Sequence, residues 1–97
     1  MTDASGSTVT LRAREGEPLD DRPVRDMVVA TAHAIAERTG VPLLALTTDA
    51  DSITVTLDAG RIEAVGFAAE LRRLTGRWYA SKFGDDDLWG PTDESWR

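Results

Sequence analysis

Two segments of the chain, residues 8–14 and 53–57, alternate apolar and polar residues one by one. Because successive side chains of a β-strand point to opposite faces, each segment predicts a strand with one apolar face. Residues 43–48 form a short apolar run, and the polar cluster 49–52 separates this run from the second alternating segment. A polar cluster between two such runs is typical of a tight turn, so 43–57 predict a β-hairpin.

Two other segments follow the helical period. From Arg22, apolar residues recur every three or four positions as far as Ile35, and Thr39-Gly40 supplies a stop, since glycine readily takes the left-handed conformation that ends helices. A second segment with this spacing begins after residues 58–60 and reaches about Thr75, where Gly76 repeats the stop. The sequence therefore predicts two helices, one before and one after the hairpin.

Residues 77–83 decide between two folds. This segment is rich in residues that favour strands, and Gly84 follows it. As a strand, it gives the order β-α-β-β-α-β of the ferredoxin-like fold, an antiparallel sheet in the order 4-1-3-2 with both helices on one face. As a continuation of the second helix through Gly76, it gives β-α-β-β-α with a three-stranded sheet. We predict the ferredoxin-like α+β fold, with the three-stranded sheet as the alternative.

The tetrapeptide Thr-Val-Thr-Leu occurs at 8–11 and again at 54–57, and a helix ending in Thr-Gly follows each copy. The recurrence suggests a structural repeat, although a favourable strand tetrapeptide can also recur by chance. In the predicted strand order, these two segments are neighbours at the centre of the sheet.

The length of the chain fits one domain, which we place at residues 8–84. Residues 1–7 are small and polar and predict a disordered lead-in. Residues 85–97 form an acidic tail with two of the three tryptophans, whose large rings are costly to expose. We favour a tail that docks Trp89 onto the domain. The alternative is a recognition motif whose partner-binding residues are Leu88, Trp89 and Trp96.

The net charge of −6 opposes binding to nucleic acid or to anionic lipid. Without cysteine, the chain forms no disulfide, and it has no thiolate that could act as a nucleophile or as a metal ligand. No apolar run approaches the roughly 20 residues of a membrane span, and the first residues lack the features of a secretory signal. These observations predict a cytoplasmic protein that binds neither nucleic acid nor membranes.

With helices on one side of the sheet, its other face presents mostly threonine hydroxyls. A domain of this topology that binds RNA stacks bases on aromatic residues of the central strands, which are absent here. A hydroxyl and guanidinium surface suits a small ligand or anion, whereas a wet or dimer-covered face is the simpler interpretation. The candidate ligand-binding residues are Thr8, Thr10, Arg12, Thr54 and Thr56.

His33, the only histidine, has Glu37 one turn further on and Asp26 two turns back, as a general base or a metal site requires. No second histidine supports such a site, and a solvated helix face is the better interpretation. The chain shows no catalytic motif, and we predict no catalytic residues, no metal ligands and no cofactor. Protein-protein binding, with self-association into a homodimer included, is the first hypothesis. A sheet-face ligand is the second, and a small enzyme around His33 that uses Glu37 and Arg12 is the third.

Overall fold

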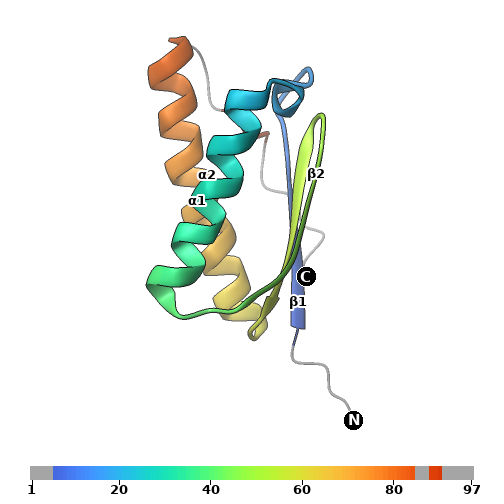
Figure 1. Cartoon of the computed structure of the whole chain (residues 1–97), viewed down its shortest axis with the longest axis vertical. Helices are drawn as coiled ribbons and strands as arrows, with labels where there is room; N and C mark the ends of the chain where they lie inside the picture. Colours follow the sequence, from blue (N-terminus) through green and yellow to red (C-terminus); the bar gives the residue numbers. More distant parts are fainter. Residues whose placement is uncertain (1–5, 85–87, 91–97) are drawn as a thin grey trace.

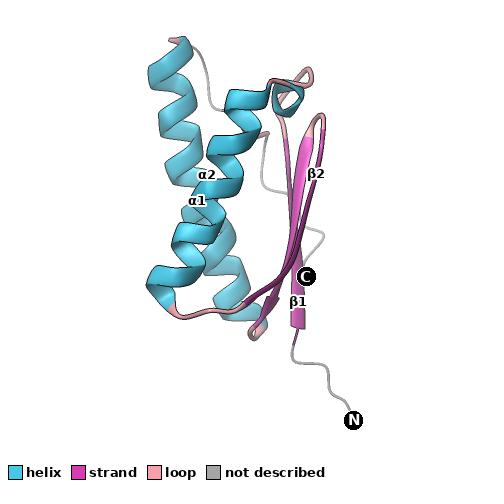
Figure 2. Cartoon of the chain, viewed as in Figure 1, coloured by secondary structure: helices cyan, strands magenta, loops and turns pink. Residues whose placement is uncertain are grey.

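The computed structural model describes residues 6–84 and 88–90. The described residues form an α+β fold in which both helices lie on one face of an antiparallel, three-stranded sheet (Figures 1 and 2). The strand order is β1-β3-β2, so that β1 and β2 are parallel to each other and antiparallel to β3. In chain order the elements are β1 (Gly6–Arg12), the short 3-10 helix η1 (Pro18–Asp20), α1 (Arg22–Thr39), β2 (Leu43–Asp49), β3 (Ser52–Asp58) and α2 (Arg61–Phe83).

The two strands that share the Thr-Val-Thr-Leu sequence are neighbours, as predicted. Their register places Thr8 opposite Thr56 and Thr10 opposite Thr54. The alternation therefore turns threonines outward on both strands and apolar side chains toward the helices. Strand β1 begins at Gly6, so Gly6 and Ser7 belong to the sheet rather than to the predicted lead-in. Residues 1–5 lie outside the described part of the chain.

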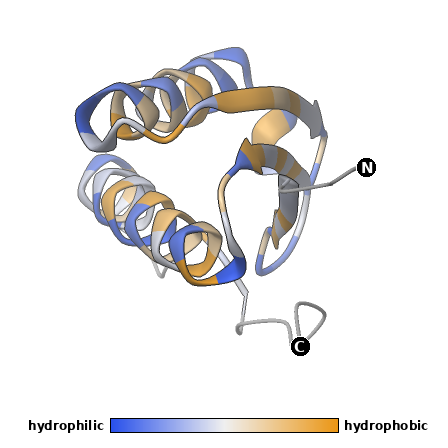
Figure 3. Ribbon diagram, turned by 90° about the horizontal axis from the view of Figure 1, so that it is seen from below, coloured by the Kyte–Doolittle hydropathy of each residue, from blue (hydrophilic) through white to orange (hydrophobic). Residues whose placement is uncertain are grey.

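The core lies between the sheet and the helices, where apolar residues of both layers face each other (Figure 3). Helix α1 begins at Arg22 and ends before Gly40, which has the left-handed φ of 75°, as the sequence predicted. Neither helix of the described chain is long and apolar enough to cross a bilayer. The buried apolar side chains of the strands and of α1 are Val9, Leu11, Ile53, Val55, Leu57, Val24, Val28, Ala32 and Ile35.

The prediction of a fourth strand at residues 77–83 is wrong, because α2 includes these residues and ends at Phe83. The ferredoxin-like order 4-1-3-2 is therefore not formed, and the β-α-β-β-α alternative describes the molecule. Gly76 is buried and does not have a positive φ. A glycine inside a helix costs only about 1 kcal/mol, which burial of the surrounding residues offsets. The stop that the sequence placed at Gly76 lies at Gly84, whose φ is 64°.

Residues Leu88–Gly90 return to the outer edge of β1. The amide of Arg14 donates to the Leu88 carbonyl at 3.0 Å, and the amide of Gly90 donates to the Arg12 carbonyl at 3.0 Å. These bonds form a single antiparallel bridge between Ala13 and Trp89. The position beside β1 that we expected a fourth strand to fill thus holds a three-residue segment further along the chain.

Candidate functional site

Trp89 is a core residue, which confirms the predicted docking of this ring. Its side chain is 1% exposed, and that of Leu88 is 2% exposed. The indole Nε1 donates to Thr75 Oγ1 at 2.8 Å, and the guanidinium of Arg72 donates to the carbonyl of Gly90. Leu88 and Trp89 are thus occupied within the chain rather than exposed to a partner. Trp96, the third tail residue proposed as an anchor, lies outside the described residues.

The threonines expected on the open sheet face do share that face, and they bond to one another. The hydroxyls of Thr8 and Thr56 are 2.9 Å apart, and those of Thr10 and Thr54 are 3.0 Å apart. Arg12 shares the alternation of Thr8 and Thr10 and is exposed. Each pair shares one hydrogen bond, which leaves one hydroxyl hydrogen of the pair available to a ligand. Ligand binding here stays a prediction.

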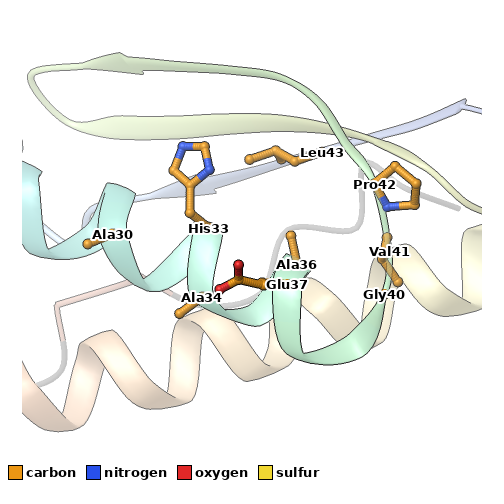
Figure 4. Close-up of a pocket in the computed structure, with 9 residues that line it drawn as sticks. All are labelled: Ala30, His33, Ala34, Ala36, Glu37, Gly40, Val41, Pro42 and Leu43. Atoms are coloured by element: carbon orange, nitrogen blue, oxygen red, sulfur yellow. The ribbon is translucent and has the colours of Figure 1, made fainter.

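A wide, open hollow of about 700 Å³ lies between the end of α1 and the start of β2 (Figure 4). His33 and Glu37 line it and are exposed. Arg12, which completes the enzyme hypothesis, follows the alternation of the sheet face that the helices leave open, so the structure does not bring it to His33. In residues 6–84 and 88–90, no three carboxylate, imidazole or thiol side chains converge as metal ligands would. The hollow is apolar elsewhere, lined by Ala30, Ala34, Ala36, Gly40, Val41, Pro42 and Leu43.

On the other side of α1, the two helices enclose a smaller hollow of about 420 Å³ with Ile35 and Phe67 among its lining residues. Glu70 at its rim accepts hydrogen bonds from Arg73 at 2.9 Å and from Arg38 at 3.0 Å. The hydrogen bond from Arg73 lowers the pKa of Glu70, and Arg38 acts in the same direction, while desolvation opposes them. This cluster ties α1 to α2 and leaves Glu70 already paired.

Strand β2 is the unusual element of the sheet. It pairs with β3 alone, and no described residue pairs with its outer edge. Its first four residues are apolar: Leu43 and Leu46 pack partly buried against the core, whereas Leu44 is 58% exposed. From Leu43 to Thr48 the strand carries no charge. By contrast, β3 buries Ile53, Val55 and Leu57.

Edge strands of monomeric proteins are usually protected by lysine, proline, charge or an overlying segment. The edge of β1 has such a cover at one end, namely Leu88–Gly90. Strand β2 has an irregularity between Leu43 and Ala45 at its start, and Asp49 and the nearby η1 at its end, while the residues between carry no charge. We call the outer edge of residues Leu43–Asp49 the β2 edge, and it is the candidate functional site.

Sequence reasoning did not single out the β2 edge, although its signals were present. The predicted strand order already placed this strand at the rim of the sheet. The run Leu43–Leu46 is continuously apolar, as expected of a strand covered on both faces, rather than alternating as expected of a strand with one wet face. An apolar run in a rim strand therefore places apolar side chains on both faces of the sheet beside an open edge.

The chain matches no protein-family model, and no curated protein is similar enough to indicate a relationship.

Proposed function

We propose that the protein is a binding module that pairs with another polypeptide along the β2 edge. The supporting observation is that Leu43–Thr48 carry no charge and include exposed Leu44, in a strand with one open side. In strand addition, main-chain hydrogen bonds supply much of the affinity, and side chains on alternate positions supply specificity. Both are available along β2.

Exposed Leu44 gives this pairing a driving force, whereas Leu43 and Leu46 already pack partly buried against the core. Full burial of one such side chain is worth about 1.5–3 kcal/mol, and Leu44 is more than half exposed in the isolated chain. The absence of charge between Leu43 and Thr48 removes the desolvation penalty that a covered ion would impose. Addition of a strand would therefore bury apolar surface without burying a charge.

The other two hypotheses lack a comparable observation. The hydroxyls of Thr8, Thr10, Thr54 and Thr56 bond in pairs, and the enzyme hypothesis combines His33 with Arg12, which follows the alternation of the sheet face away from the core. Polypeptide binding is the function that the geometry supports best.

Selection of random heptapeptides displayed on phage, with the whole chain as bait, tests this proposal. We expect the selected peptides to be uncharged and rich in β-branched residues. When a selected synthetic peptide is titrated into the labelled protein, the amide NMR shifts should change along Leu43–Asp49 and not along β1.

A matched pair of variants sharpens the test. Leu44→Lys places a charge on the β2 edge and should weaken peptide binding about tenfold, since covering that charge costs desolvation. Ile62→Lys is the control, because Ile62 is 85% exposed on α2, away from the sheet edge. Peptides that bind elsewhere, or that bind Leu44→Lys as tightly as the original chain, would refute the proposal.

A further inference from the structure

The solvent-exposed side of α1 carries a stripe of exposed residues at helical spacing. Arg22 and Asp26 form an ion pair on it at 3.7 Å. His33 and Glu37 continue the stripe one and two turns beyond Ala30, and they line the hollow beside the start of β2 (Figure 4). We call Arg22, Asp26, Ala30, His33 and Glu37 the α1 stripe.

The charges of the α1 stripe are complementary to those of the same stripe turned end for end. Consider two α1 helices packed antiparallel about a two-fold symmetry axis. When this axis passes between residues 29 and 30, Arg22 of one chain lies level with Glu37 of the other. The midpoint between Asp26 and His33 falls at the same place, so those residues also come level across the pair. The residue at the crossing is Ala30, whose small side chain allows two helices to approach closely. One two-fold axis thus places Arg22 opposite Glu37 at both ends and the His33 imidazole opposite Asp26.

The β2 edge is also compatible with its own copy. Because Leu43–Thr48 carry no charge, two copies meet along the strand without like-charge repulsion, despite the net charge of −6 on each chain. In an antiparallel pair centred on Leu46, the two Asp49 residues lie at opposite ends, about 20 Å apart at 3.3 Å per residue. An antiparallel addition continues the pattern of β3 beside β2.

The two-fold axis that relates two α1 helices and the two-fold axis that relates two β2 strands lie at nearly the same height along the molecule. Helix α1 ends at Thr39 and β2 begins at Leu43, at the same end of the molecule (Figure 1). Ala30 lies about 13 Å back along α1 from Thr39, at 1.5 Å per residue. Leu46 lies about 10 Å along β2 from Leu43. A single two-fold axis can therefore pass close to both Ala30 and Leu46.

We propose that the polypeptide bound at the β2 edge is a second copy of this chain. The two β2 strands pair antiparallel into a continuous six-stranded sheet, and the two α1 helices lie side by side over the junction. This inference rests on the proposed function and names its partner. A lone added strand would cover β2 but leave the α1 stripe exposed, whereas a second copy covers both and narrows the hollow beside His33.

Charge exchange between the two ends of the stripe tests the arrangement. In a two-fold dimer, Glu37→Arg places two arginines opposite each other at both ends, and Arg22→Glu does the same with two glutamates. Each variant alone should raise the dimer dissociation constant about tenfold in sedimentation equilibrium. An equimolar mixture of the two variants should regain the original constant, because in the mixed dimer an arginine meets a glutamate at both ends.

Glu63→Arg is the matched control, since it makes the same change of charge at an exposed position on α2. It should leave the dissociation constant unchanged. A dimer in which the mixture is no tighter than either variant would overturn the helix contact. A chain that stays monomeric at millimolar concentration would overturn the dimer itself, and peptide binding to Leu43–Asp49 in that monomer would still support the proposed function.

Discussion

The indole of Trp89 donates a hydrogen bond to the hydroxyl of Thr75, which in turn donates to the carbonyl of Leu71, at 2.8 and 2.5 Å. The bond from Trp89 to Thr75 joins a residue beyond α2 to a residue within that helix. Thr75 directly precedes Gly76, where we expected the helix to end. A buried polar group needs a partner, and each side of this pair supplies one.

We expect Trp89→Phe to lower the free energy of unfolding by about 1–2 kcal/mol, from the lost hydrogen bond and the smaller ring. Urea denaturation of Trp89→Phe, Thr75→Val and the double variant isolates the pairwise contribution. The double variant should be more stable than the sum of the two single losses predicts. Strict additivity would show that the hydrogen bond contributes nothing to stability.

Gly66 within α2 and Gly84 directly after it should respond in opposite directions to alanine. Gly66 lies within the helix, and a Cβ added there meets no atom within 4 Å. Gly66→Ala should therefore stabilise the chain by about 0.5–1 kcal/mol. Gly84 has a φ of 64°, so Gly84→Ala should destabilise it by about 1 kcal/mol. Thermal unfolding followed by circular dichroism measures both changes, and a loss of stability in Gly66→Ala would contradict the helical geometry at that residue.

The lowered pKa of Glu70 makes stability depend on pH in the acid range. Because the folded-state pKa lies below the ordinary value of 4.5, the paired carboxylate stabilises the fold above that pH. The stabilisation is lost as the pH falls through the folded-state pKa. Glu70→Gln should therefore be less stable than the original chain at neutral pH, and the difference should shrink in acid. Urea denaturation at a series of pH values measures this, with Glu15→Gln in an exposed loop as the control.

The paired hydroxyls of the threonine face should be energetically coupled. Thr10 and Thr54 face each other across β1 and β3 with their oxygens 3.0 Å apart. A double-mutant cycle with Thr10→Val and Thr54→Val should give a coupling of about 0.5 kcal/mol, in the range of cross-strand pairs. Thr10 with Thr47, which lies on β2 rather than on the neighbouring strand, is the control pair and should show none.

The elements that local pattern determines were predictable from the sequence. Strands β1 and β3 alternate strictly, and the turn between β2 and β3 is polar. The end of α1 depends on a Thr-Gly pair that does adopt the left-handed conformation at Gly40. In each case, the residues that decide the structure are adjacent in the chain.

The second Thr-Gly pair shows why the rest could not be predicted. Thr75-Gly76 has the same local signal as Thr39-Gly40, yet Thr75 is bonded to Trp89, fourteen residues later, and the helix continues. A contact between distant residues overrides a preference worth about 1 kcal/mol. The β2 edge was not predicted for the same reason. Whether an apolar run such as Leu43–Leu46 lies at an open edge depends on which strands pair with it, and residues distant in the chain decide that.

The bridge between Ala13 and Trp89 also determines when this chain can complete its fold. Strand β1 is synthesised long before Trp89, whose backbone bridges Ala13 just beyond the end of that strand. Contacts of such long sequence separation pay a large loop-closure entropy before they stabilise anything. A nascent chain that stops at Gly84 therefore exposes an unfinished core, and we expect folding to become cooperative only after Gly90 has left the ribosome.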